Sequence, residues 1–142
     1  MPRRSEYTLR RRVQFYEADS AGIVHFSNYF RYMEEAEHAL WREAGVNIAP
    51  RGSDVGFPRV AASFEYLRPL YFGDEFEARI RVAAMGEKSI RYTCTLKKGE
   101  EKIGTGSVTV VCVGKREGGG MKARPFPPEI ADRFEVSAED RE

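Results

Sequence analysis

The chain has 142 residues, of which 42% are hydrophobic and 12% aromatic, and its formal net charge is +1. A chain of this length and composition is expected to fold as one domain, spanning 1–142, that buries roughly 70% of its unfolded surface. The nearly balanced charge argues against a general binder of nucleic acids, so any attraction to phosphate groups must come from a local patch.

The sequence lacks the patterns typical of an export signal or a membrane span. No run of about 20 apolar residues occurs, and the basic residues 1–6 are not followed by an apolar stretch of signal-peptide length. Cys94 and Cys112 are far apart and lack metal-ligand spacing, so we interpret them as buried, reduced thiols and expect no metal site. Together these features indicate a cytoplasmic protein.

The first predicted elements are a strand and a long helix, joined by an acidic loop. Residues 7–16 alternate, imperfectly, between apolar and polar side chains and predict the strand. Beyond the loop, apolar residues recur at spacings of four, three, four and four, which predicts a helix with one continuous buried stripe. The stripe consists of Tyr29, Met33, Ala36, Leu40 and Ala44. Gly45 can take the left-handed conformation that many helix ends require, so we expect it to end the helix.

The rest of the core is predicted to be sheet. Residues 46–58 are rich in turn formers and predict a loop. Alternating segments then predict four strands, at 59–70, 75–84, 89–97 and 103–113. Because these strands need a cover for their shared apolar face, the one amphipathic helix is expected to pack against them. The predicted fold class is therefore α+β, with a five-stranded antiparallel sheet and one long central helix.

Residues 114–142 are predicted to extend a core that spans about 7–113. Gly114 and the three glycines at 118–120 predict a flexible connector. A short helix is expected to begin at Pro128, because proline is favoured at the first position of a helix.

Asp19 is the main candidate for chemistry, because it lies in the acidic loop just before the helix. The first N–H groups of a helix lack partners within it and form the positive end of its dipole, so a carbonyl docked there would be polarised. An aspartate is ionised at neutral pH and can attack such a carbonyl or accept a proton from water. Asp19 could instead make an Asx turn or cap the helix. Gly22 would let the backbone approach a substrate, or would satisfy an unusual dihedral angle.

The segment from Val13 to Phe30, VQFYEADSAGIVHFSNYF, carries an acidic-x-Asp-x-x-Gly-[Ile/Val]-Val pattern. Together with weaker similarity at 64–69 and 73–74, it resembles the signature of the 4-hydroxybenzoyl-CoA thioesterase family, over roughly residues 7–113. The resemblance implies the hotdog fold, in which a curved antiparallel sheet wraps a central helix. It also implies an acyl-CoA thioesterase, which hydrolyses a thioester to a carboxylic acid and free coenzyme A (CoA). It does not specify the acyl group.

The resemblance implies roles for residues around the acidic loop. Asp19 would be the nucleophile or the general base, and the backbone N–H of Phe26 would point at the thioester carbonyl. Glu17 is expected to hold the loop in preference to acting directly. His25 lies one position before the histidine of many relatives, so we interpret it as a packed or hydrogen-bonded residue in preference to a catalyst. Glu34 matches a position that contacts the neighbouring subunit's acyl group in some relatives, or is a solvated helix charge.

The resemblance also implies a patch for the phosphates of CoA at the turn between the third and fourth strands. Lys88, Ser89 and Arg91 occupy this turn, and Ser89 and Arg91 would share one strand face. Basic side chains suit phosphate groups, although these residues could be only a soluble strand end. CoA is part of the substrate, so no separate cofactor is expected.

A single hotdog unit leaves a sheet edge open, and such edges are usually paired or covered. Edge-to-edge pairing of two copies would build pockets at the interface, so we expect a homodimer or homotetramer. Two alternative functions use the same fold: a hydratase or dehydratase with Asp19 and His25 acting together, and a non-catalytic acyl-CoA-binding protein. The hydratase pattern Gly-Asp-x-Asn-Pro is absent from the sequence.

Overall fold

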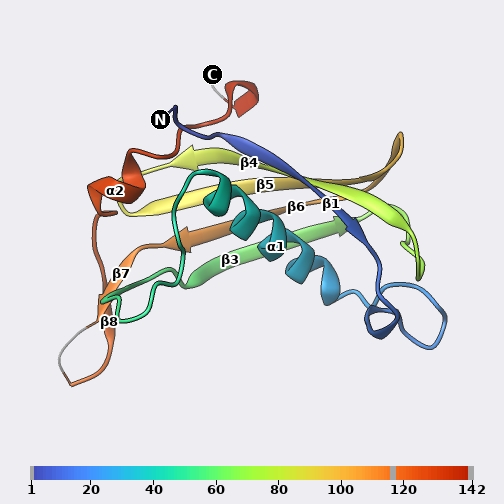
Figure 1. The fold of residues 1–142 in the computed structure, drawn as a ribbon. Helices are drawn as coiled ribbons and strands as arrows, with labels where there is room; N and C mark the ends of the chain where they lie inside the picture. Colours follow the sequence, from blue (N-terminus) through green and yellow to red (C-terminus); the bar gives the residue numbers. More distant parts are fainter. Residues whose placement is uncertain (1, 116–117, 141–142) are drawn as a thin grey trace.

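The segments in which apolar and polar residues alternate form the strands of one antiparallel sheet. The computed structural model describes residues 2–115 and 118–140. Its five main strands have the spatial order β1-β4-β5-β6-β3 (Figure 1). Their bounds are Glu6–Arg12 for β1, Arg59–Tyr66 for β3, Glu75–Met85 for β4, Ser89–Lys98 for β5 and Glu101–Val111 for β6. This sheet, together with one main helix, confirms the predicted α+β class, and it leaves β1 and β3 as the two edges.

Helix α1, Asn28–Glu43, lies across one face of this sheet (Figure 1). The apolar stripe predicted for it is buried at all five positions. Two hydrogen bonds end the helix: the Gly45 N–H donates to Arg42 O (3.0 Å) and the Val46 N–H donates to Trp41 O (2.9 Å). Gly45 has a φ of +77°, as a Schellman ending requires. The prediction that Gly45 stops the helix is confirmed.

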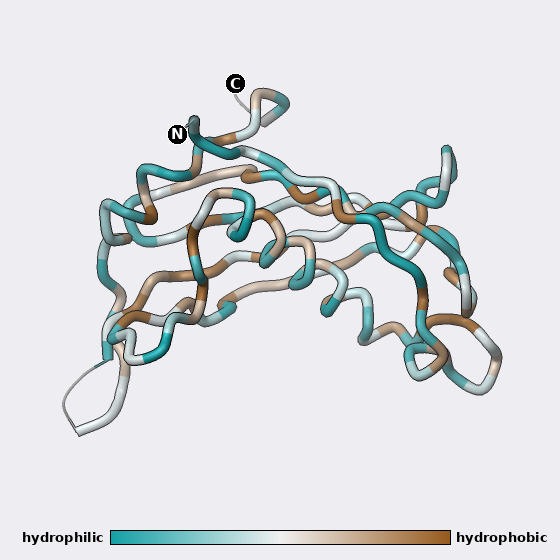
Figure 2. The backbone as a smooth tube through the Cα atoms, in the orientation of Figure 1, coloured by the Kyte–Doolittle hydropathy of each residue, from teal (hydrophilic) through white to brown (hydrophobic). Residues whose placement is uncertain are grey.

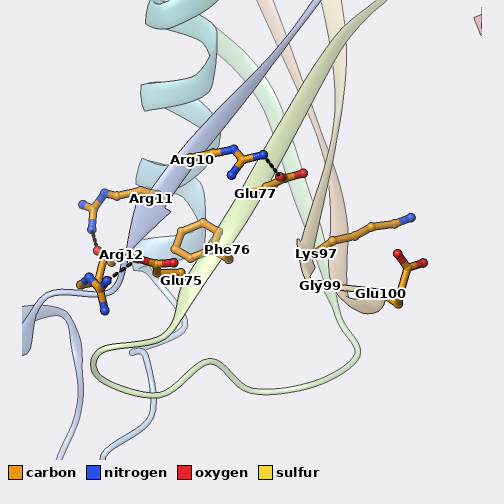
Figure 3. A pocket seen from close by; sticks show the side chains of 9 residues that line it. All are labelled: Arg10, Arg11, Arg12, Glu75, Phe76, Glu77, Lys97, Gly99 and Glu100. Atoms are coloured by element: carbon orange, nitrogen blue, oxygen red, sulfur yellow. Dashed lines mark hydrogen bonds and ion pairs between the residues drawn. The ribbon is translucent and has the colours of Figure 1, made fainter.

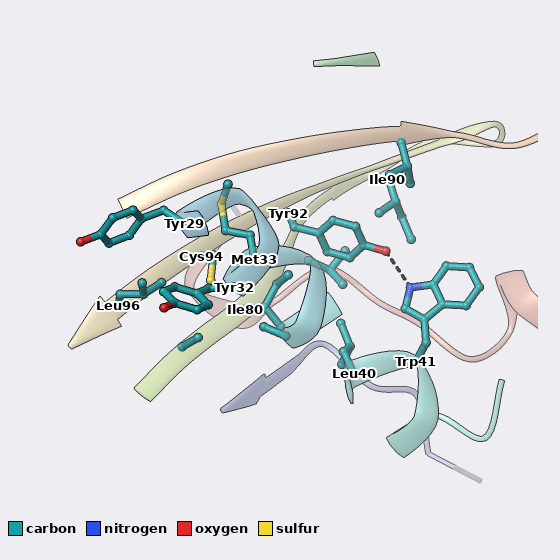
Figure 4. Close-up of a cluster of buried hydrophobic side chains, with 14 of the residues drawn as sticks. Tyr29, Tyr32, Met33, Leu40, Trp41, Ile80, Ile90, Tyr92, Cys94 and Leu96 are labelled. Carbon is teal, nitrogen blue, oxygen red and sulfur yellow. Dashed lines mark hydrogen bonds between the residues drawn. The ribbon is translucent and has the colours of Figure 1, made fainter. Parts of the chain in front are cut away.

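The core consists of buried side chains from α1 and from the middle strands, which pack against one another (Figure 4). Hydrophobic and hydrophilic residues alternate along much of the chain (Figure 2). On β4 and β5 nearly every second residue is buried, so one face of these strands forms the core. Within the core the Trp41 indole N–H donates to the Tyr92 hydroxyl (2.8 Å). Cys94 and Cys112 are buried free thiols, as predicted, and burial raises the pKa of Cys94 to about 12.

Three aromatic rings fix the start of α1 against β3. The Tyr29 ring centroid lies 5.1 Å from those of Phe64 and Tyr66, which are 4.9 Å apart. Gly104 and Gly106 on β6 leave room for Phe64, since a Cβ atom at either position would lie within 2.7 Å of its ring. By leaving room for Phe64, the two glycines of β6 help to determine the position of the start of α1 on the sheet.

Three strands end earlier than predicted, the last of them β6, which was predicted to residue 113 and ends at Val111. The first, predicted over 7–16, ends at Arg12, and the 3₁₀ turn η1 (Phe15–Glu17) follows it. The second, predicted over 59–70, ends at Tyr66. The first two ladders stop at the pairs Arg12–Glu75 and Tyr66–Gly104, because the partner strand, and not the residue type, determines where pairing ends.

The region predicted as a loop and a flexible connector contains a second, small sheet. β2 (Val55–Gly56) pairs with β7 (Val113–Lys115), and β7 pairs with β8 (Met121–Ala123). The connector prediction is therefore wrong for Gly114, which lies in β7, while Gly118, Gly119 and Gly120 lie between β7 and β8. Residues 116–117 lie outside the described part of the chain. Helix α2 (Pro128–Ala131) begins at the predicted proline.

The chain after α2 returns to the main sheet. The Ser137 N–H donates to Val82 O on β4 (2.8 Å), and the 3₁₀ turn η2 (Ala138–Asp140) follows. Near the other terminus, Arg4 and Phe134 form an isolated bridge. Both ends of the described chain thus lie together, far from the loop at 15–25 (Figure 1).

Gly106→Ala should lower the free energy of unfolding by about 1–3 kcal/mol, the usual cost of overpacking a core. The new methyl group would lie 2.6 Å from the Met33 sulfur and from the Ser63 backbone oxygen. Urea unfolding followed by circular dichroism measures the change. Gly86→Ala is the control, because its Cβ would approach only the Ser89 hydroxyl, at 3.5 Å. Equal unfolding midpoints for the two variants would contradict this packing.

Candidate active site

The loop between β1 and α1 is built around the buried carboxylate of Glu17. Arg11 on β1 binds it with two parallel hydrogen bonds, Nη1 to Oε1 (2.7 Å) and Nη2 to Oε2 (2.6 Å). The Gln14 N–H (2.8 Å) and the Tyr32 hydroxyl (3.0 Å) also donate to Oε1. Arg11 reaches Glu35 on α1 as well (2.9 and 3.0 Å). One carboxylate therefore joins the strand, the loop and the helix.

The protonation states of this cluster follow from its contacts. Burial alone would raise the pKa of Glu17, but hydrogen bonds from Arg11, Gln14 and Tyr32 and the charge of Arg11 hold the pKa below its usual value. Burial and the adjacent Glu17 charge raise the pKa of Tyr32. Hydrogen bonds to Glu35 and Glu17 raise the pKa of Arg11. At neutral pH the cluster is a charged pair with a neutral phenol, which supports the interpretation that Glu17 holds the loop.

Asp19 is exposed and takes part in a tight turn. Its Oδ1 accepts the Ala21 N–H (2.8 Å), the Asx turn considered from the sequence. Its N–H donates to Ile23 O (2.8 Å) and its carbonyl accepts the Gly22 N–H (3.0 Å). Oδ2 has no hydrogen-bond partner within residues 2–115 and 118–140. Since the turn uses only one carboxylate oxygen, the structural and chemical roles of Asp19 are compatible.

Gly22 has a φ of +83°, and no atom lies within 4 Å of where its Cβ would be. The turn therefore needs glycine for its backbone conformation. The space beside it is open, so the two interpretations of Gly22 are compatible.

A groove of about 490 Å³ lies beside this turn. It is lined by Asp19, Ile23, Val24, His25, Phe26, Tyr29, Tyr66, Leu67, Arg68 and Pro69. The structure thus brings together Asp19, His25 and Phe26, three of the predicted catalytic positions. The Phe26 N–H has no hydrogen-bond partner among the described residues, while the Tyr66 hydroxyl donates to the Phe26 carbonyl (2.9 Å).

His25 makes local contacts at the entrance to α1. Its Nδ1 lies 2.8 Å from the Ser27 hydroxyl and accepts the Ser27 N–H (3.3 Å). Its ring centroid lies 4.7 Å from that of Phe26. These contacts agree with a hydrogen-bonded residue, and a catalytic role for His25 stays a prediction.

The other predicted binding residues lie away from this groove. Ser89 and Arg91 share the outer face of β5, as predicted, opposite the buried Ile90. Position 96 of β5 pairs with Gly104 of β6, which also pairs with Tyr66 at the groove. Ser89 is seven residues from that point, roughly 23 Å along a strand.

Glu34 does not line the groove. It lies 3.7 Å from Arg59, at the other end of β3 from Tyr66. Lys88 is exposed in the turn before β5. One chain therefore carries the predicted site residues as two groups, one at each end of β3.

Sequence reasoning gave no role to Tyr66, Leu67 and Arg68, which line the groove. The sequence offered only the weaker family resemblance over 64–69, and the exposure of Tyr66 and Leu67 at the end of β3 is seen only in the structure. Sequence reasoning also assigned no role to Glu37. This residue lies four positions after Met33 and three before Leu40, so it falls beside the buried stripe of the helix.

A larger groove, of about 600 Å³, lies on β1, β4 and β5 (Figure 3). It is lined mainly by charged side chains, but those on β1 are already paired. Arg10 binds Glu77 (3.3 Å) and Arg12 binds Glu75. Because these arginines already bind glutamates, the groove has less positive charge available for phosphate groups than its number of arginines indicates.

Residues 2–115 and 118–140 contain no group of three or more His, Cys, Asp or Glu side chains that could hold a metal ion. None of the described helices is long and apolar enough to cross a membrane.

Residues 13–134 match the family model of the thioesterase-like superfamily. The chain belongs to this superfamily. A 1,4-dihydroxy-2-naphthoyl-CoA hydrolase from Synechococcus elongatus is 26% identical to it over 138 residues, covering 95% of this chain and 99% of the relative.

Two solved structures carry the same fold. A hypothetical protein from Aquifex aeolicus superposes with a TM-score of 0.83 at 29% identity, covering 91% of this chain and 99% of that one. A gentisyl-coenzyme A thioesterase superposes with a TM-score of 0.76 at 27% identity, covering 88% and 99%. The predicted hotdog fold and the prediction of a thioester hydrolase are confirmed at the level of the thioesterase-like superfamily.

Glu17→Gln should lower the free energy of unfolding at pH 7 by about 3 kcal/mol, the lower end of the cost of breaking a buried ion pair. The cost falls at the lower end because Arg11 remains paired with Glu35 in the variant. Since the folded-state pKa of Glu17 is lowered, its stabilisation is complete above the ordinary pKa of about 4.3 and is lost as pH falls through the folded value. The difference between wild type and variant should therefore shrink from pH 7 to pH 3. Urea unfolding across this range measures it.

Glu75→Gln is the matched control, because Glu75 pairs with Arg12 on the exposed surface. Exposed pairs contribute about 0–1 kcal/mol. A pH-independent difference for Glu17→Gln would show that Glu17 does not stabilise the loop as a charged group.

Proposed function

We propose that this member of the thioesterase-like superfamily is an acyl-CoA thioesterase that uses Asp19. The observation that carries the proposal is the groove in which the Asp19 carboxylate and the Phe26 N–H lie together. Among the described residues, one Asp19 oxygen and this N–H have no hydrogen-bond partner. Superfamily membership supports the reaction class.

The reaction needs a donor for the carbonyl oxygen and an acid–base or nucleophilic group. The Phe26 N–H would donate to the thioester oxygen as negative charge develops on it, an interaction commonly worth a factor of about 10²–10³ in rate. Asp19 would either accept a proton from the attacking water or attack the carbonyl carbon itself. In both routes the C–S bond breaks, the sulfur leaves as the CoA thiolate and is protonated, and water supplies the oxygen of the acid.

The complete site would require two copies of the chain. β3 is an edge strand with an exposed, uncharged run over 60–63, the kind of edge that invites pairing. Antiparallel pairing of two β3 strands about a two-fold axis would place the Asp19 groove of one copy beside the Glu34 end of the other. The same operation would bring Lys88 and Arg91 toward the partner's groove. A homodimer, or a tetramer of such dimers, would thus unite the two groups of site residues.

Aryl-CoA thioesters are the substrates that we propose to test first. The relatives named above are a 1,4-dihydroxy-2-naphthoyl-CoA hydrolase and a gentisyl-CoA thioesterase. The groove beside Asp19 contains the rings of Phe26, Tyr29 and Tyr66, which suit an aromatic acyl group.

Asp19→Asn should lower thiol release from aryl-CoA esters by at least about 10², because it removes the proposed base or nucleophile. Release of CoA followed with a thiol reagent measures this. Asp132→Asn is the control, since Asp132 is an exposed aspartate on α2's end. Full activity of Asp19→Asn would exclude the proposed role. Conversion of an enoyl-CoA without thiol release would favour a hydratase, and binding without turnover would favour a non-catalytic protein.

Ser63→Lys should shift the monomer–dimer equilibrium toward monomers, because it places a charge on the proposed pairing edge. Since the proposed site needs two copies of the chain, most thiol release should be lost with the dimer. Sedimentation velocity measures the oligomer, and circular dichroism checks that the fold is retained. Thr8→Lys is the matched control, because Thr8 is exposed on β1, the opposite edge. A fully active wild-type monomer would refute the two-copy site.

A further inference from the structure

The turn at residues 25–28 leaves one backbone donor free beside the candidate active site. The Asn28 N–H donates to His25 O (2.9 Å), and the Ser27 N–H donates to His25 Nδ1 (3.3 Å). The Phe26 N–H has no such partner among the described residues. Those residues contain no cis peptide bond, and in a trans peptide unit the C=O and the N–H point in opposite directions. Because the His25 carbonyl points at Asn28, the Phe26 N–H points away from the start of α1.

This turn is held in place from two sides. From its own loop, the Glu17 carbonyl accepts the His25 N–H (2.9 Å) and a hydrogen bond from Asn28 Nδ2 (2.9 Å). From the sheet, the Tyr66 hydroxyl donates to the Phe26 carbonyl (2.9 Å). Within the described part of the chain, this is the one hydrogen bond that joins a strand of the main sheet to the turn. The Tyr66 bond therefore fixes the orientation of the turn relative to β3.

Tyr66 is the last residue of β3, and two neighbouring rings fix its position. Its ring centroid lies 5.1 Å from that of Tyr29 and 4.9 Å from that of Phe64. Burial raises the pKa of the Tyr66 hydroxyl, so the hydroxyl is neutral and able to donate at pH 7. The residue is 46% exposed, and one hydrogen bond between neutral groups contributes only modestly to stability. The bond to Phe26 therefore matters more for the orientation of the turn than for the stability of the fold.

We propose that Tyr66 is a positioning residue, whose hydroxyl holds the Phe26 peptide so that the Phe26 N–H is directed at the carbonyl oxygen of a bound thioester. This step rests on the proposed function, in which that N–H stabilises the developing negative charge. A donor lowers the barrier most when it is already oriented before the charge develops. Tyr66 supplies this orientation from the sheet and does not itself touch the reacting atoms.

Tyr66→Phe is the variant that isolates this role, because it removes the hydroxyl and keeps the ring. The rings of Tyr29 and Phe64 keep their packing partner. The Val24 N–H still donates to Leu70 O (2.8 Å), so the loop keeps its path along the sheet. Only the bond that orients the turn is lost. Small displacements of a reacting or stabilising group can cost a factor of up to about 10² in rate.

The first test measures thiol release from benzoyl-CoA. In Tyr66→Phe we expect kcat to fall roughly 10- to 100-fold while KM stays unchanged, because the lost stabilisation develops only in the transition state. The urea unfolding midpoint should stay at the wild-type value. Tyr7→Phe is the matched control and should keep the wild-type kcat, because Tyr7 is a partly buried tyrosine on β1, the opposite edge of the sheet.

The alternative roles of Tyr66 give different results in the same measurements. A lower unfolding midpoint with a wild-type kcat would show a structural hydrogen bond only. A raised KM with a wild-type kcat would show a direct contact with the substrate. Either result, or an unchanged kcat and KM, would overturn the positioning role. Absence of thiol release from the wild-type protein would overturn the proposed function, and the positioning role with it.

Infrared spectroscopy tests the orientation of the donor without turnover. Asp19→Asn can keep the turn at residues 19–22 and should release thiol slowly, so benzoyl-CoA labelled with carbon-13 at its carbonyl can be observed while bound. A hydrogen bond from the Phe26 N–H weakens the C=O bond and lowers its stretching frequency. Adding Tyr66→Phe to this variant should return the frequency toward that of the free ester.

The infrared result separates the two proposals. An equal lowering of the frequency with and without the Tyr66 hydroxyl would overturn the positioning role while leaving the proposed function intact. No lowering on binding to Asp19→Asn would overturn the assignment of the Phe26 N–H as the donor, and the role of Tyr66 with it.

Discussion

The ion pair between Arg11 and Glu17 is the contact on which the candidate site depends. Arg11 comes from an edge strand, Glu17 from the loop, and the hydroxyl of Tyr32 and the carboxylate of Glu35 bring in the helix. The Glu17 carbonyl also accepts the His25 N–H (2.9 Å). Because all of these bonds converge on one buried residue, the turn that carries Asp19 has a fixed position relative to the helix start.

The two buried glutamates of the sheet–helix interface differ in the contacts that surround them. Glu17 accepts four hydrogen bonds and its pKa is lowered, which fits a charged structural anchor. Glu37 binds Arg59, and burial outweighs this attraction and raises its pKa to about 7. The same side chain in two settings thus has opposite pKa shifts, because hydrogen bonds outweigh burial at Glu17 and burial dominates at Glu37.

The sheet's geometry underlies the proposal that two copies of the chain share one site. β3 is an edge, and its two ends carry different groups: aromatic and carboxylate residues at the Asp19 groove, and Glu34 with Arg59 at the other end. Tyr66 at the groove and Arg59 stand at opposite ends of β3, roughly 23 Å apart along the strand. A two-fold axis would place opposite ends of two β3 strands side by side, which is why we propose a site shared by two copies.

Local patterns in the sequence determined the helix with its buried stripe, its end at Gly45, the antiparallel strands and the turn chemistry of Asp19, because each depends on neighbours within a few residues. Tertiary structure alone decided the strand ends and the hairpin of β7 and β8, since pairing partners far away in the chain set where a ladder stops. It also decided which carboxylates are buried: Glu37 meets Arg59 across 22 positions of sequence. Periodicity shows which face of an element a residue occupies, but only the packed fold shows whether a side chain of opposite charge lies next to that face.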